Sequence, residues 1–225
     1  MYKYLERKEE TIALIRRLSN DLEKLSEGKI STNDVSPERL WWEIFNKIFA
    51  ILATCENCIV TKDSLTAHLI ARYTYEVLII SGYIFIDDND AQKKIEQFVN
   101  FDQFQRAECK WTDKTYIQMI KEIPGDSRFS FHKEFYRKLC NFAHPTMDSF
   151  LLNRRGDKFE FLMILNTAHL TIDTILEIVK LCFEKNVYFS DKQKTIFDIS
   201  AISTKSKKLM KELEVSQQKG SNIVP

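Results

Sequence analysis

The segment EFYRKLCNFAHP, residues 134–145, combines residue types suited to phosphate chemistry with a regular spacing. Arg137, Asn141 and His144 follow one another at intervals of four and three residues. On a helix they would therefore fall within about 60° of one another. Pro145 disfavours the α conformation at His144, which places this histidine at or just beyond the last turn. The spacing predicts a cation, an amide and an imidazole together at one helix end.

These side chains suit RNA cleavage without a metal ion, in which a base takes the 2′-hydroxyl proton and an acid protonates the leaving oxygen. We expect His144 to transfer protons, because its unperturbed pKa is about 6.5. We expect Arg137 to hold phosphate with its planar pair of donors, and Asn141 to orient one of these groups. One histidine does not easily fill both proton roles, so a second copy would come from the partner in a homodimer. The simpler interpretation of the trio is a polar seam between helices.

A second charged pair lies in an earlier apolar segment. Arg72 and Glu76 are four residues apart within LTAHLIARYTYEVLIISGYIF, residues 65–85. The apolar surroundings predict that this pair is partly buried. We assign both as supporting residues of the candidate site, and the alternative is that their contact only locks helix packing.

The composition limits the fold and the location of the chain. Its 225 residues are 44% apolar and include only five glycines and four prolines, which favours one domain of long helices. The formal charge of +1 means that any contact with RNA must be local. We expect a cytoplasmic protein, because its five cysteines are scattered and its N-terminal segment lacks the apolar core of a signal peptide. We expect it not to enter the membrane, because its longest apolar run has only ten residues.

Apolar residues at three- and four-residue steps predict a series of helices. The first covers residues 2–26 and ends at Gly28, and the second begins with Ser36 as its N-cap and Pro37 as its first helical residue. The second half of residues 61–85 has a strand-like composition, but we favour a helix because no partner strand is evident. Helices after the second are expected over about 61–85, 87–108, 112–123, 130–143, 158–185 and 191–213.

Other residues capable of chemistry form weaker patterns. Asn166, His169 and Asp173 make a polar stripe in an apolar helix, which indicates either a hydrogen-bonded core histidine or support for the candidate site. The CENC segment, residues 55–58, has the spacing of zinc and redox motifs but no second cysteine pair. The lysines of TKSKKLMKELE, residues 204–214, are either solvated surface or a contact for RNA backbone or an acidic partner. We expect no metal ion and no cofactor.

The segment YRKLCNFAHP resembles the signature of the HEPN superfamily, in which an arginine is followed by four to six residues and a histidine. Arg137 and His144 match the ends of this signature. Lys138 departs from the small polar residue that active members tend to carry after the arginine, and Asn141 is the displaced polar helper. The segment with Arg72 and Glu76 is similar to a prokaryotic HEPN-like family that carries an arginine and a glutamate on an earlier apolar helix.

The resemblance implies an all-α fold, a HEPN-like up-and-down helical bundle with peripheral N- and C-terminal helices. One domain would cover residues 1–215, with the HEPN-like core at about 35–185 and a flexible tail at 216–225. It also implies a metal-independent endoribonuclease that forms a homodimer and acts in the cytoplasm as the effector of a toxin-antitoxin or antiviral defence system. Two alternatives remain: a catalytically inactive module that dimerises or binds a protein partner, and an antitoxin or regulator of a separate enzyme.

Overall fold

The computed structural model describes residues 2–26, 36–85, 87–99, 112, 114–123, 132–143, 157–185 and 197–221. These residues are almost entirely helical and contain no strand, which confirms the predicted all-α class. The helices are α1 (Tyr2–Ser26), α2 (Pro37–Thr61), α3 (Ser64–Ile84), α4 (Asp88–Val99), α5 (Tyr116–Lys121), α6 (His132–Ala143), α8 (Asp157–Glu184) and α10 (Ile199–Ser221).

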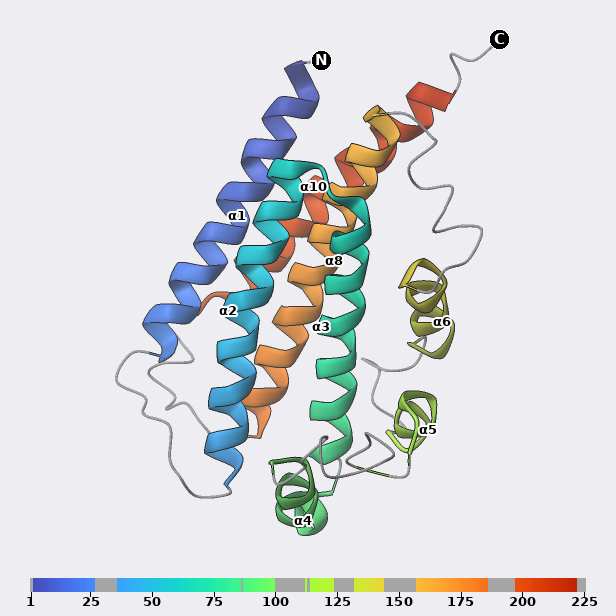
Figure 1. Cartoon of the computed structure of the whole chain (residues 1–225). Helices are drawn as coiled ribbons and strands as arrows, with labels where there is room; N and C mark the ends of the chain where they lie inside the picture. The colour runs from blue at the N-terminus through green and yellow to red at the C-terminus, as the bar shows by residue number, and fades with distance from the viewer. Residues whose placement is uncertain are drawn as a thin grey trace.

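The long helices form a bundle whose centre is the pair α3 and α8 (Figure 1). Helix α2 packs against α1, α3 and α8, while α10 packs against α8 and α1. The shorter helices α5 and α6 contact α3 on the side away from α1 (Figure 1). The start of α1 and the end of α10 lie at the same end of the bundle (Figure 1).

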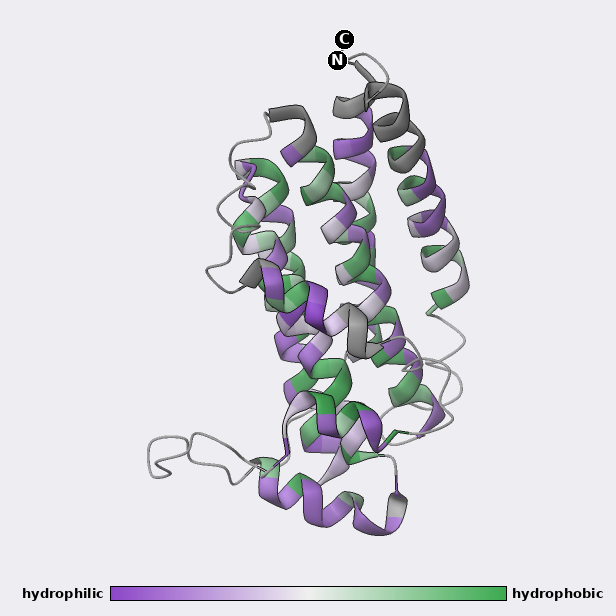
Figure 2. Cartoon of the chain, turned by 90° about the vertical axis from the view of Figure 1, so that its right-hand side faces the viewer, coloured by the Kyte–Doolittle hydropathy of each residue, from purple (hydrophilic) through white to green (hydrophobic). Residues whose placement is uncertain are grey.

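The apolar stripes of the long helices form the core. The side chains that periodicity places on the inner faces of α1 and α2 are at most 6% exposed, namely Ile12, Ile15, Leu18, Leu22 and Leu25 of α1 and Leu40, Ile44, Ile48 and Leu52 of α2. Hydrophobic residues accordingly gather on the inner sides of the helices and hydrophilic residues on the outer sides (Figure 2). Burial of one such side chain contributes about 1.5–3 kcal/mol, so these stripes supply much of the stability.

Helix α3 is apolar around most of its circumference because it packs on both sides. It contacts α2 and α8 on one side and α5 and α6 on the other. The segment with strand-like composition is a continuous helix from Ser64 to Ile84, which confirms the favoured interpretation. β-Branched side chains are tolerated there because tertiary packing outweighs their modest helix penalty.

Capping residues fix the starts of α2 and α3. Ser36 has an extended conformation, and its side chain accepts a hydrogen bond from the Arg39 N–H at 3.2 Å. Asp63 caps α3 in the same way, since its Oδ1 accepts from the Thr66 N–H at 3.0 Å. Lys62, with φ of 59°, takes the left-handed conformation that ends α2. The chain therefore reverses direction between α2 and α3 with very few residues.

The last helix differs from its predicted bounds. Helix α10 begins at Ile199 rather than near residue 191, and it ends at Ser221 rather than near 213, so it overlaps the predicted tail at 216–225. Asp198 determines the start, because its Oδ1 accepts a hydrogen bond from the Ala201 N–H at 2.8 Å. Ile202, Leu209 and Leu213 are buried against the bundle.

A buried polar network, here called the His169 network, joins α1, α8 and α10 through Thr11, His169 and Ser206. His169 Nε2 lies 3.1 Å from Thr11 Oγ1, and His169 Nδ1 lies 3.2 Å from Ser206 Oγ. Thr11 donates its one hydroxyl hydrogen to the Arg7 carbonyl oxygen at 2.8 Å, so it accepts from His169 and the hydrogen of the ring is on Nε2. The interpretation of His169 as a hydrogen-bonded core residue agrees with this geometry.

Candidate active site

Helix α6 presents two of the predicted catalytic residues to solvent. Tyr136 and Leu139 are buried and face the bundle, whereas Arg137 and Asn141 are exposed. Residues four positions apart share a helix face, so Arg137 and Asn141 lie on the same outward side. The side chains of Arg137 and Asn141 are therefore accessible to solvent. His144 and Pro145 lie outside the described residues.

A contact, here called the Glu76 tether, fixes α6 to α3 and consists of Arg72, Glu76 and Tyr136. Tyr136 Oη donates to Glu76 Oε1 at 2.9 Å, and Arg72 Nε donates to the same oxygen at 2.9 Å. The side chains of Arg72 and Glu76 are only 23% and 14% exposed. The predicted supporting pair therefore exists as a partly buried ion pair, and its second partner comes from α6.

Aromatic rings surround the tether. The centroid of the Tyr116 ring, from α5, lies 5.6 Å from that of the Tyr136 ring. The centroid of the Tyr75 ring, from α3, lies 6.3 Å from that of the Tyr136 ring. Arg72 Cζ is 6.0 Å from the Tyr136 centroid, at the outer limit of a cation–π contact. These rings limit the access of water to the ion pair and strengthen its hydrogen bonds.

Electrostatics assign the tether a structural role. Burial, and then the charge of Glu76, raise the pKa of Tyr136 well above its usual value, and the same causes raise the pKa of Tyr116 to about 12. Tyr136 therefore stays protonated near neutral pH and acts as a hydrogen-bond donor. The charge of Arg72 is committed to Glu76, so a phosphate at Arg72 would have to compete with a carboxylate.

The two sets of predicted site residues lie on different sides of α6. The tether faces the bundle through Tyr136, while Arg137 and Asn141 face outward. The backbone of α6 links them, since Tyr136 directly precedes Arg137. Arg72 and Glu76 are thus placed to hold the helix that carries Arg137, rather than to touch a substrate bound by it.

Tyr136→Phe is expected to lower the free energy of unfolding by about 1.5–3 kcal/mol, because it removes a hydrogen bond to a charged group and leaves Glu76 with one donor fewer. Urea unfolding followed by circular dichroism measures this change. The matched control is Tyr73→Phe, which removes the same hydroxyl from an exposed tyrosine of α3 and should change stability by less than about 0.5 kcal/mol. Equal effects of the two substitutions would show that the tether contributes nothing specific.

Tyr136 and Tyr116 are not among the site residues predicted from the sequence. The position of Tyr136 three residues before Leu139 marks it as part of the buried face of α6, which is a usable signal. Its hydrogen-bond partner is 60 residues earlier in the chain, however, and helix periodicity carries no information about such a pair.

The cysteines of CENC are unsuited to chemistry. Cys55 and Cys58 are both buried in α2. Burial raises the pKa of Cys55 to about 12, and burial together with the charge of Asp63 raises that of Cys58 to about 11. Both remain neutral thiols near pH 7. Within the described part of the chain, no group of three histidine, cysteine or acidic residues could hold a metal ion.

Two helices, residues 37–61 and 160–184, are long and apolar enough to cross a membrane by length and composition. Core helices of water-soluble proteins meet the same criterion, and 72% of the apolar window of the second helix is buried inside the bundle, against 44% for the first.

Known proteins provide no further guide to this site. We compared the chain with protein-family models, with curated proteins and with solved structures. None of the three comparisons found a match.

Proposed function

We propose that this chain is a HEPN-like, metal-independent endoribonuclease that acts as a cytoplasmic homodimer. The observation that carries the proposal is the exposure of Arg137 and Asn141 on one face of α6, next to the residue that fixes this helix to the core. Among the described residues Arg137 forms no ion pair, so it can bind a phosphate without breaking one. The resemblance of YRKLCNFAHP to the HEPN signature supports the reaction class and a role as a toxin-antitoxin or antiviral effector.

In this proposal the chemistry needs only groups that two copies of the chain supply. Arg137 holds the scissile phosphate through two of its N–H groups. His144 of one protomer takes the 2′-hydroxyl proton, the 2′-oxygen attacks phosphorus, and the bond to the 5′-oxygen breaks. His144 of the other protomer protonates that leaving oxygen. The products are a 2′,3′-cyclic phosphate and a 5′-hydroxyl.

Degradation of total RNA in excess EDTA tests the proposal. Wild-type protein should cleave the RNA, and Arg137→Ala should cleave it much more slowly because the phosphate loses its cation. The matched control is Arg17→Ala, which removes an exposed arginine of α1 that pairs with Asp21. It should leave the rate unchanged. Identical RNA patterns for all three proteins and for a sample without protein would favour the inactive alternative.

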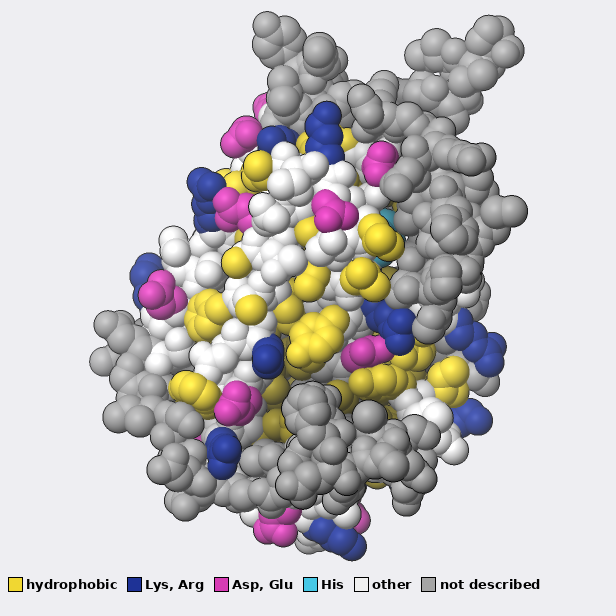
Figure 3. Space-filling model, viewed as in Figure 1, with side chains coloured by type: hydrophobic (Ala, Val, Ile, Leu, Met, Phe, Trp, Pro, Cys, Tyr) yellow, Lys and Arg dark blue, Asp and Glu magenta, His cyan; other side chains and the backbone are white. Residues whose placement is uncertain are grey.

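A second candidate function, a module that dimerises or binds a protein partner without catalysis, is favoured by a separate observation. Leu65, Leu69 and Tyr73 follow one another at steps of four residues along α3 and are 47%, 41% and 41% exposed. In a space-filling view, hydrophobic side chains gather on the face formed by α2 and α3 (Figure 3). A line of exposed apolar side chains is typical of a protein contact.

The double substitution Leu65→Ser and Leu69→Ser is expected to weaken self-association at least about tenfold, because it removes two apolar anchors. Sedimentation velocity over a range of protein concentrations measures this effect. Ala13→Ser, at an exposed position of α1, is the control. A wild-type chain that stays monomeric at every concentration, or a double variant that dimerises as well as wild type, would contradict a homodimer through this face.

A further inference from the structure

An open cleft of about 590 Å³ lies between α1 and α10, on a different side of the bundle from α6. Arg7 and Glu10 line it from α1, and Thr204, Lys205 and Leu209 are among the residues that line it from α10. Sites for small molecules typically have volumes of about 300–1,000 Å³, so this cleft is large enough for a compact ligand.

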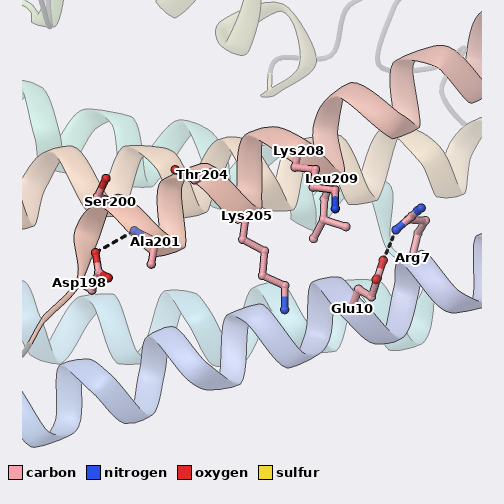
Figure 4. A pocket seen from close by; sticks show the side chains of 9 residues that line it. All are labelled: Arg7, Glu10, Asp198, Ser200, Ala201, Thr204, Lys205, Lys208 and Leu209. Atoms are coloured by element: carbon pink, nitrogen blue, oxygen red, sulfur yellow. Dashed lines mark hydrogen bonds and ion pairs between the residues drawn. The ribbon is translucent and has the colours of Figure 1, made fainter.

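Lys205 and Lys208 supply the uncommitted positive charge of the cleft, and Asp198, whose carboxylate accepts a hydrogen bond from the Ala201 N–H, also lines it. Arg7 pairs with both Glu10 and Glu212, so its charge is already satisfied. Lys205 and Lys208 are exposed and form no ion pair within the described ranges. Their spacing of three residues makes them neighbours on α10, and Lys205 extends from α10 toward α1 (Figure 4). A ligand would therefore meet two ammonium groups on one wall.

The other lining groups define the chemistry of that ligand. Ser200 and Thr204 add two hydroxyls on the same helix as the lysines. Ammonium and hydroxyl donors together match the oxygens of a phosphate monoester. Ala201 and Leu209 provide apolar surface for a ring, and the Glu10 carboxylate can accept a hydrogen bond from a hydroxyl or amino group.

The walls of the cleft are already fixed without a ligand. The His169 network joins the two helices, with distances of 3.1 Å from His169 to Thr11 and 3.2 Å to Ser206. Thr11 follows Glu10 in the chain and Ser206 follows Lys205, so the network joins α1 and α10 at positions next in sequence to residues that line the cleft. A ligand would not have to order these helices, which lowers the entropic cost of binding.

We propose that the cleft between α1 and α10 binds a phosphate monoester of nucleoside-monophosphate size, with its phosphate held by Lys205 and Lys208. The site goes beyond the ribonuclease proposal and does not depend on it. A free nucleotide and the 5′-phosphorylated end of an RNA strand share this chemistry, and the two are distinguished by experiment.

Isothermal titration calorimetry of the full chain tests the site. The ligands are AMP and adenosine as one pair, and short RNA oligonucleotides that carry or lack a 5′-phosphate as the other. We expect the phosphate to strengthen binding at least about tenfold in each pair of ligands. Lys205→Gln with Lys208→Gln should weaken AMP binding by at least about tenfold. The matched control is Lys207→Gln with Lys211→Gln, which makes the same charge change at exposed lysines of α10 outside the cleft.

Tighter binding of AMP than of the phosphorylated oligonucleotide would identify a free nucleotide as the ligand, and the reverse order would identify an RNA end. Either order supports the site if the two double variants differ. The proposal is overturned if neither phosphorylated ligand binds at millimolar concentration, or if both double variants lose affinity equally, since equal loss would indicate only general attraction to a basic helix.

Discussion

His144→Ala is expected to slow RNA cleavage by about 100- to 10,000-fold, the range that a positioned acid or base contributes. The effect should be at the upper end of this range because the same residue serves twice in the proposed homodimer, once as base and once as acid. The circular dichroism spectrum and the unfolding midpoint of His144→Ala should match those of wild type, which would show that the slower cleavage is not caused by a loss of folding.

The rate is measured in single turnover with excess protein, so that binding and product release do not limit it. His132→Ala removes a histidine of α6 and is the control, with a rate within about twofold of wild type expected. Asn141→Ala should fall between the two, because an orienting group contributes less than a proton-transfer group. Cleavage by His144→Ala at the wild-type rate would rule out the assigned role of this residue.

The second large expected effect is a loss of stability at acidic pH that originates at His169. Burial lowers the pKa of His169 to about 4, from an unfolded value of about 6.5. Between these values the unfolded state binds the proton and the folded state does not. Stability is therefore fully present above about pH 6.5 and falls as the pH drops toward 4, by roughly 3 kcal/mol in total.

The pKa values of two other groups, His68 and Asp173, are also shifted and affect the pH dependence of stability. Burial lowers the pKa of His68, which adds a loss in the same direction. Burial raises the pKa of Asp173, four residues after His169, so its protonation favours the folded state as the pH falls and opposes the loss. A comparison with His169→Gln cancels both contributions to a first approximation, because glutamine offers a donor and an acceptor but does not titrate.

Urea unfolding of both proteins at several values between pH 7 and pH 4 measures the difference. Wild type should lose roughly 3 kcal/mol more than His169→Gln over this range. Parallel stability curves for the two proteins would contradict this expectation, because they would show that the pKa of His169 is the same in the folded and unfolded states.

The fold was predictable where local rules decide it. The apolar spacing of Ile12, Ile15 and Leu18 determines the inner face of α1, and Ser36 with Pro37 determines the start of α2. The bounds of α10 were less predictable, because the cap at Asp198 is not distinguished by composition from the polar residues before it. Packing against α8 and α1 then holds a lysine-rich helix in place.

The contact between Arg72 and Glu76 was predictable from the sequence, but the partner of this pair on α6 was not. The spacing of Arg72 and Glu76 correctly predicts their contact, since both lie on one helix. The participation of Tyr136 in the same hydrogen bond depends on how α6 packs on α3, which is a property of the whole bundle. The same reason explains why His169 was identifiable as a core residue while its partners, Thr11 and Ser206, were not.

Cleavage of one RNA oligonucleotide and its fully 2′-O-methylated counterpart, in excess EDTA, shows whether the 2′-hydroxyl is the nucleophile, as the proposed reaction requires. We expect wild-type protein to cut only the unmodified strand and to leave a 2′,3′-cyclic phosphate, and we expect Arg137→Ala to cut it far more slowly. An intact RNA strand, equal cleavage of both strands, or wild-type cleavage by Arg137→Ala would contradict the proposed reaction.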